Sequence, residues 1–296
     1  MKKIIALAVA SAFVAPAFAA DVTVSGDVEY FYTDKNAGSA FNSGDQDVVV
    51  TASEDLGNGM SVTASLEMDG DSHNGADTAT ETTMGSDSSL TISGDGFSLQ
   101  IGDATDTAVE AFDEVSDKAE QGGTSGDSAV STEHSALLKI MPMENVTVAL
   151  STGTVNDAAD ATSYTVNSYA IQFGVMGATI AYGVADNENE SKNLSTLSFS
   201  YAAGPVSIGY ESISNKAYVD KDDQTNLGLA YAYGNGNLFV ESGELKDDSA
   251  STTTETTAVG VSYKLGAVNT YVVSNTVSTT GSTDDDQTII GVEYAF

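Results

Sequence analysis

The residues of this chain that could carry chemistry are mostly carboxylates, and they concentrate between positions 104 and 133. That stretch holds a single basic side chain, Lys118. Val109, Phe112 and Val115 recur at intervals of three, which predicts a short helical turn. The acidic residues in it and just before it are Asp103, Asp106, Glu110, Asp113, Glu114, Asp117, Glu120, Asp127 and Glu133. A connection this long and this acidic indicates a functional loop or a disordered one.

Catalytic chemistry has little support in the sequence. The chain has two histidines that could act as a general base, His73 and His134. Because serine is abundant, a serine near either histidine is no evidence for a catalytic pair. Cysteine is absent, so two histidines cannot complete a zinc site. The sequence contains neither G-x-x-x-x-G-K-[ST] nor G-x-G-x-x-G, the two glycine-rich motifs that bind the phosphates of nucleotides. We therefore expect no enzymatic activity and no cofactor.

Clusters of carboxylates leave the question of a metal open. Calcium takes several oxygen ligands, which Asp220–Asp223 and Asp284–Asp286 could supply. No segment has the full ligand spacing of an EF-hand, so a solvated loop tip is the alternative reading of each cluster.

The elements that must position these carboxylates are strands. In the segment 22–33, apolar Val22, Val24 and Tyr30 alternate with polar residues such as Asp27 and Glu29, which is the period of a strand. The full set of predicted strands is 22–33, 46–54, 60–69, 85–93, 97–103, 134–141, 145–153, 163–173, 177–186, 192–202, 205–213, 224–233, 237–245, 255–264, 267–276 and 287–296.

The connections between these strands alternate between tight and long. Tight turns rich in Gly, Asn or Pro are predicted at 56–59, 94–96, 142–144, 174–176, 204, 234–236 and 266. Longer polar loops are predicted at 34–45, 70–84, 104–133, 154–162, 187–191, 214–223, 246–254 and 277–286. This alternation predicts an all-β, up-and-down, antiparallel transmembrane barrel of 16 strands. A β-solenoid lacks the required short repeat here, and a soluble two-sheet sandwich would not alternate its connections so regularly.

The N-terminus predicts export to the outer membrane of a Gram-negative bacterium. Lys2 and Lys3 precede a short apolar run, and Ala17-Phe18-Ala19 is a cleavage pattern. We expect a signal peptide at 1–19, with cleavage after Ala20 as the alternative, and one barrel domain at 20–296. No later apolar stretch is long enough for a membrane-spanning helix, so a closed barrel is the remaining way to cross lipid.

The charge balance excludes some partners and favours others. The chain has 43 acidic and 10 basic residues, and every basic residue is lysine. A formal charge of −33 should repel nucleic acid and attract cations. A content of 41% hydrophobic residues argues against disorder.

Strand phasing predicts which charges face the lumen. Acidic residues on the polar faces are Asp27, Glu29, Glu67, Asp69, Glu211 and Glu293. Lys139 and Lys264 are the lysines that this phasing points inward. An acidic lining concentrates cations, which predicts a cation preference. Adaptation of the whole protein to a saline habitat would explain the same acidity.

The chain ends in "IIGVEYAF", in which Ile290, Val292, Tyr294 and Phe296 share one apolar face. We expect this last strand to pair with the first and close the barrel, because an open edge in lipid would leave backbone groups unsatisfied. Tyr294 and Phe296 would then act as the terminal aromatic anchor.

Three pieces of the sequence resemble the sixteen-stranded general porins, above all the porins of photosynthetic and marine Gram-negative bacteria. They are "DVTVSGDVEYFY" after the signal, "FSLQIGD" before the long loop, and "VEYAF" at the end. The resemblance implies a homotrimer in outer-membrane lipid and lipopolysaccharide, with each channel narrowed by the third loop, 104–133, folding inward. It places Asp106, Glu110, Asp113, Glu114, Asp117 and Lys118 at the constriction. Relatives put arginines on the opposite wall, and this chain has none.

The predicted function is a passive diffusion channel for small hydrophilic solutes, with a preference for cations. A structural or adhesive surface barrel with a plugged lumen is the alternative, because it would use the same strands.

Overall fold

The structure is a computed structural model that describes residues 21–36, 38–69, 85–103, 106–112, 115–119, 134–157, 162–187, 193–215, 222–247 and 251–296. Its strands are β1 Asp21–Lys35, β2 Gly38–Gly57, β3 Met60–Asp69, β4 Gly85–Gly94, β5 Phe97–Gly102, β6 His134–Met143, β7 Val146–Asp157, β8 Thr162–Val175, β9 Ala178–Asn187, β10 Asn193–Ala203, β11 Val206–Asn215, β12 Asp222–Tyr233, β13 Gly236–Asp247, β14 Thr252–Leu265, β15 Val268–Thr279 and β16 Asp285–Ala295. A 3-10 helix, η1, spans Glu110–Phe112.

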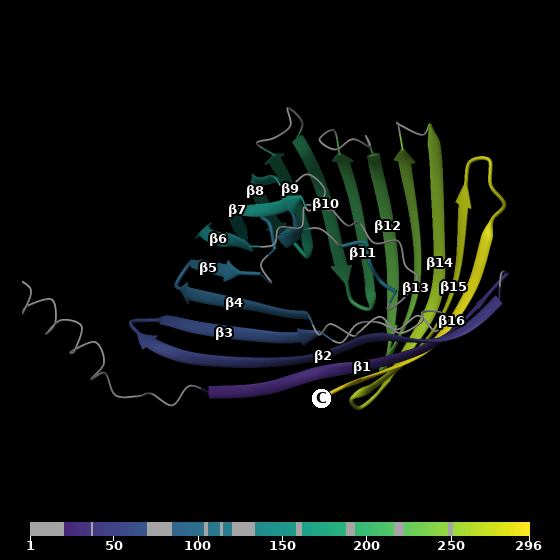
Figure 1. Ribbon diagram of the computed structural model, residues 1–296, viewed down its shortest axis with the longest axis horizontal. Helices are drawn as coiled ribbons and strands as arrows, with labels where there is room; N and C mark the ends of the chain where they lie inside the picture. Colours follow the sequence, from purple (N-terminus) through teal and green to yellow (C-terminus); the bar gives the residue numbers. More distant parts are fainter. Residues whose placement is uncertain are drawn as a thin grey trace, which may run out of the picture.

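These strands form one closed antiparallel barrel in which each strand pairs with its neighbours in the sequence. β1 also pairs with β16, and Figure 1 shows the C-terminus beside the beginning of β1. The predicted fold class and the number of strands are therefore confirmed. Among the described residues, no helix is long and apolar enough to cross a membrane.

Alternate side chains along each strand meet different surroundings. In β13, Leu238 and Val240 are exposed on the outer face, whereas Phe239 and Glu241 are buried on the inner one. A soluble barrel has apolar side chains inside and polar side chains outside. This barrel has apolar side chains outside, but its inner face carries apolar as well as polar groups. Most tyrosines in the described strands face outward, and Tyr271 is a buried exception.

The tight turns use residues that tolerate positive φ. Asn58 and Gly59 join β2 to β3 with φ of 55° and 76°. One predicted turn is displaced: Pro142 belongs to β6, where a register shift between Ile140 and Met143 accommodates it, and Asn145 makes the turn with φ of 64°. A bulge near a strand end is where a sheet tolerates the missing N–H of proline.

The first connection differs from the prediction. The segment 34–45 was expected to be a long loop, but β2 begins at Gly38 and its first residues pair with the end of β1. A bulge in β2 opposite Glu29 absorbs the change of register. Tyr30 and Phe41 stack across the pair with ring centroids 5.9 Å apart. Pairing with β1 overrides the loop-like composition of this segment.

The last residues complete the ladder between β16 and β1. Gly26 N donates to Phe296 O at 3.1 Å, and Phe296 N donates to Gly26 O at 2.9 Å. The rings of Tyr294 and Phe296 stack with centroids 6.1 Å apart. The barrel therefore has no free edge at the junction of its two ends.

Candidate functional site

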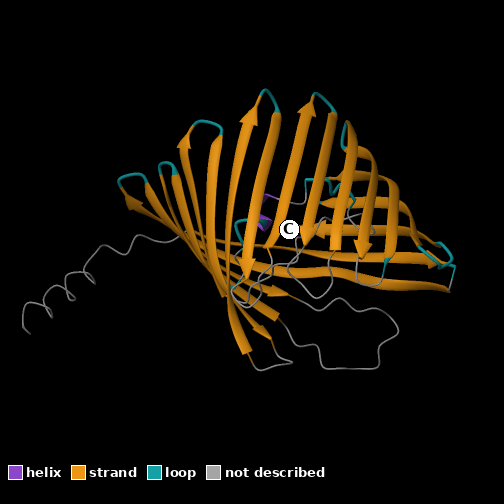
Figure 2. Ribbon diagram, turned by 90° about the horizontal axis from the view of Figure 1, so that it is seen from above, coloured by secondary structure: helices purple, strands orange, loops and turns teal. Residues whose placement is uncertain are grey.

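The first described part of the third loop, 106–112, lies against inward-facing side chains of the barrel wall. Figure 2 shows η1, in purple, surrounded by strands. Ala108 N donates to Ser151 Oγ of β7 at 2.9 Å and to Ser168 Oγ of β8 at 2.8 Å. Ser198 Oγ of β10 donates to Phe112 O at 2.7 Å. The loop backbone is thus hydrogen-bonded to three strands.

Apolar contacts support the same placement. Val109 is fully buried in a cluster on the inner faces of β8 to β11. Phe112 packs against a second cluster that includes Leu137 and Ala149, and Lys139 Nζ lies 5.8 Å from the centre of the Phe112 ring. The other members of these clusters are Val166, Ala185, Leu194, Ile213, Ala108 and Ala170.

The second described part of the loop, 115–119, is held by two buried carboxylates. Glu211 of β11 accepts from Ser116 N at 3.1 Å and from Ser116 Oγ at 2.9 Å. Glu241 of β13 accepts from Lys118 N and, at 2.7 Å, from Ala119 N. Both glutamates are 1% exposed.

The charged groups of this loop segment interact mainly with one another and with the wall. Lys118 Nζ donates to Val115 O at 2.6 Å and to Asp117 O at 3.0 Å. Partial burial lowers the pKa of Lys118, although Glu241 opposes this. Partial burial and the carboxylate of Glu241 raise the pKa of Asp117 above its ordinary value. The positive charge of Lys118 is therefore directed at backbone carbonyls of its own loop.

A second group of carboxylates lines the wall formed by β1 to β4 and β16. In the strand register, Asp27 lies opposite Asp47, and Glu67 lies opposite Asp87. Directly opposed residues of neighbouring strands point to the same face. These four side chains are partly or fully accessible, unlike Glu211. Such like-charged pairs are unfavourable for sheet stability, so their presence on the inner face indicates a role other than packing.

Glu29 and Glu293 also lie opposite each other, in β1 and β16. Glu29 is 5% exposed and accepts a hydrogen bond from Tyr271 Oη at 2.5 Å. Glu293 is partly accessible and accepts from Asn269 Nδ2 at 3.4 Å. Tyr271 belongs to an inner apolar cluster that includes Phe31, Phe239, Ala258, Val273 and Ile289.

The inner face of the described strands carries few lysines. Lys35 shares the inward face of β1 with Thr33, close to the loop end of the barrel. Lys264 shares the inward face of β14 at the opposite, tight-turn end. Lys139 lies on β6, with its Nζ over the Phe112 ring. Lys35 was missed from the sequence because its strand was expected to end at position 33.

The remaining predicted residues are distributed as follows. Asp106 is exposed, and Glu110 Oε2 accepts from Thr107 N at 2.7 Å within the loop. Asp113, Glu114 and the side chain of Asp69 lie outside the described residues. Asp47, Asp87 and Glu241 were not among the predicted site residues. Strand alternation alone would have placed Glu241 inward, between outward Val240 and Ser242.

The acidic cluster 284–286, one of the two considered for calcium, is hydrogen-bonded to hydroxyl groups of β15. Asp284 accepts from Ser278 Oγ at 2.5 Å, and Asp286 accepts from Thr276 Oγ1 at 2.7 Å. Within the described ranges, no group of three or more His, Cys, Asp or Glu side chains is arranged to hold a metal ion. Asp220 and Lys221 lie outside those ranges.

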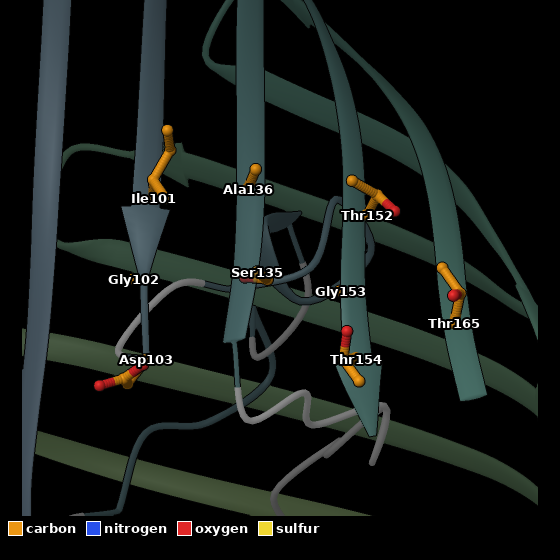
Figure 3. Close-up of a pocket in the computed structure, with 9 residues that line it drawn as sticks. All are labelled: Ile101, Gly102, Asp103, Ser135, Ala136, Thr152, Gly153, Thr154 and Thr165. Carbon is orange, nitrogen blue, oxygen red and sulfur yellow. The ribbon is translucent and has the colours of Figure 1, made fainter. Parts of the chain in front are cut away.

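A groove at the loop ends of β5 to β8 is separate from the lumen (Figure 3). Outward-facing Ile101, Ala136 and Thr152 line it, together with Thr154 and Thr165. Leu137 and Ser151, the neighbours of Ala136 and Thr152, are buried on the inner face. The groove therefore belongs to the outer surface.

Comparison with solved structures identifies the same barrel in several porins. A double mutant of Rhodopseudomonas blastica porin matches with a TM-score of 0.71 and 14% identity, covering 93% of this chain and 100% of that one. A loop-deletion mutant of OmpT, an outer membrane protein of Vibrio cholerae, matches with a TM-score of 0.74 and 12% identity over 94% and 100%. The anion-selective porin of Comamonas acidovorans matches with 0.70 and 13% over 94% and 100%.

These identities are low, so the likeness shows the fold. A search among curated protein sequences gave no match. A family model described as Gram-negative porin matches residues 6–296, nearly the entire chain. Porins are non-enzymatic outer-membrane channels, in agreement with the function expected from the sequence. The chain belongs to the Gram-negative porin family.

Proposed function

We propose that this porin is a passive, cation-preferring diffusion channel for small hydrophilic solutes, and that it works as a homotrimer in outer-membrane lipid and lipopolysaccharide. The observation that carries the cation preference is the accessible carboxylates of the inner wall at Asp27, Asp47, Glu67 and Asp87. Negatively charged walls raise the local cation concentration and exclude anions.

The lysines on the inner face do not neutralise the negative charge of these carboxylates. Lys139 of β6, with β5 between it and the acidic wall, lies over the Phe112 ring, and Lys118 donates to carbonyls of its own loop. Lys35 and Lys264 lie at opposite ends of the lumen. The field along the wall of β1 to β4 is therefore dominated by negative charge.

The third loop, 104–133, is proposed to set the bore. Its described parts cover the inner face of β6 to β13 and are held by buried hydrogen bonds. Solutes would then pass between this loop and the acidic wall. The mechanism is steric and electrostatic and needs no energy source. The anion-selective relative shares the fold, so ion preference must come from side chains such as these.

Export by a signal peptide at 1–19 completes the proposal. The mass of the protein purified from outer membranes tests it directly. Cleavage after Ala19 or Ala20 gives masses that differ by one alanine, and an uncleaved chain would refute export by this route.

The test of the channel is conductance in a planar bilayer under a salt gradient, using folded protein. We expect openings in multiples of three and a reversal potential displaced toward that of the cation. Asp27→Asn combined with Glu67→Gln should reduce this displacement. Glu255→Gln is the matched control, because Glu255 is exposed on the outer face of β14.

A reversal potential displaced toward the anion would refute the cation preference. Equal effects of the wall variant and the Glu255 control would show that the wall does not determine it. Folded protein without conductance would favour the plugged structural or adhesive barrel.

A further inference from the structure

A row of residues crosses three strands where the third loop meets the wall. Gly209 of β11 lies opposite Gly228 of β12, which lies opposite Glu241 of β13. Glu211 lies two residues after Gly209 on the same face. The loop stretch 115–119 contacts all four of these residues. We call Gly209, Gly228, Glu211 and Glu241 the saddle.

The two positions of the saddle that hold glycine have no room for a side chain. A Cβ on Gly209 would lie 1.7 Å from Val115 O, and a Cβ on Gly228 would lie 1.8 Å from Ser116 O. Neither glycine has a positive φ, so its backbone conformation suits other residues. The obstructing atoms belong to the backbone and cannot move by a change of rotamer. The absence of side chains therefore lets the loop backbone lie directly on the strands.

The two glutamates of the saddle complete the contact. Glu211 accepts from the backbone and hydroxyl of Ser116, and Glu241 accepts from the backbone of Lys118 and Ala119. A carboxylate is a strong acceptor for backbone N–H groups. Because the loop covers both carboxyl groups, they lie away from the path of a passing ion. This location contrasts with that of Asp27 and Glu67, which are accessible.

We propose that the saddle positions the third loop, and that Glu211 and Glu241 act there as hydrogen-bond acceptors and not as selectivity charges. The position of the loop in turn sets the width of the pore, a step that rests on the proposed function. Glu211, expected from its strand position to line the pore, is thereby assigned a positioning role.

Labelling of a single cysteine tests the position of the loop without measuring current. The chain has no cysteine, and Ser116 is 0% exposed, so Ser116→Cys creates a unique thiol on the buried, wall-facing side of the loop. A maleimide should label it slowly in the folded protein. Adding Gly209→Ala or Gly228→Ala should raise the rate on the order of tenfold, because each change opposes the hydrogen bonds that hold this segment.

Gly174→Ala is the matched control. Gly174 lies on the inner face of β8 in the same cross-strand row as Gly209, through Thr179 and Ser200. A Cβ there would meet only ordinary contacts, the nearest at 3.5 Å. Equal labelling rates with Gly174→Ala and Gly209→Ala would overturn the proposal.

A second pair of variants serves if the alanine substitutions prevent folding. Glu241→Gln keeps a side-chain oxygen that accepts from both backbone N–H groups but removes the charge, whereas Glu241→Ala removes the acceptor. We expect rapid labelling only with Glu241→Ala, and an unchanged reversal potential with Glu241→Gln. Labelling of the two variants at the same rate would overturn the acceptor role. A shift of reversal potential with Glu241→Gln as large as with Asp27→Asn would identify a selectivity charge instead.

Single-channel conductance then tests the step from loop position to pore width. A changed conductance in Gly209→Ala, relative to Gly174→Ala, supports that step. Faster labelling with unchanged conductance would support positioning by the saddle and refute the constriction in the proposed function. The two readouts therefore separate failure of this inference from failure of the channel mechanism.

Discussion

At the scale of single residues, the ionisation of Asp117 depends on its burial and on the neighbouring carboxylate of Glu241. Partial burial raises the pKa of Asp117, and the carboxylate of Glu241 raises it further. A raised carboxyl pKa means that the ionised form is disfavoured in the docked loop relative to a loop in water. Docking is therefore weakened above the raised pKa, and it strengthens as the pH falls through that pKa toward the ordinary value of 3.8.

We expect Asp117→Asn to hold the loop more firmly at neutral pH, because it removes the ionised group that opposes docking. Wild-type channels should show fewer brief closures as the pH is lowered toward 3.8. Channels of Asp117→Asn should show few closures at every pH. Recordings of closure frequency against pH measure both. Asp106→Asn, on the exposed first part of the loop, is the control. A variant that keeps the wild-type pH dependence would exclude Asp117 as its source.

Strand alternation predicts the face of a residue but not its burial. It placed Glu211 and Glu67 on the same inward face, yet Glu211 is buried and Glu67 is accessible. The difference arises because Ser116, 95 positions before Glu211 in the sequence, packs on one of them and not on the other. A period of two carries no information about so distant a contact. The saddle could be recognised only once the path of the loop was known.

At the scale of elements, the pairing of β1 with β2 shows where composition misleads. Residues 38–45 are rich in Gly, Ser, Asn and Asp, which favours a loop. They nevertheless extend the hairpin, and Asn42 Nδ2 donates to Thr33 Oγ1 at 3.3 Å. The other strands could be predicted because their apolar alternation is strong. The polar end of β2 has no such signal, since its partner strand supplies the stability.

Insertion of a short epitope tests this element. An insertion after Ala40 should lower the yield of folded protein, because it interrupts a paired strand and shifts its register. The same insertion after Gly281, in the turn before β16, should be tolerated. Heat-modifiable migration of the barrel on gels measures the folded fraction. Equal tolerance at both sites would favour the long first loop expected from the sequence.

At the scale of the whole molecule, the barrel is divided into two sides. Two apolar clusters occupy the inner face from β6 to β11, the described parts of the third loop cover this face as far as β13, and a third cluster lies across β13 to β16. The accessible carboxylates lie on β1 to β4. Closure and strand number could be predicted from alternation and from the apolar last strand. The division into sides could not, because it depends on which strands the loop covers.

This division predicts how selectivity depends on salt. The Debye length falls from about 10 Å at 0.1 M to about 3 Å at 1 M ionic strength, so exposed charges act over shorter distances in concentrated salt. If the accessible carboxylates act through their field, the ratio of cation to anion permeability should fall toward unity as both sides of a fixed-ratio gradient are concentrated. Reversal potentials measure this ratio.

Asp27→Asn with Glu67→Gln should lower the ratio in dilute salt and reduce its dependence on concentration, whereas Glu255→Gln should change neither. A ratio that stays constant from dilute to concentrated salt would contradict a field effect and indicate direct contact at one narrow site. A ratio near unity even in dilute salt would show that the wall does not select ions by charge. The acidity of the chain would then be explained by adaptation of the whole protein to a saline habitat. The dilute-salt measurement therefore decides between the two explanations of the acidic composition.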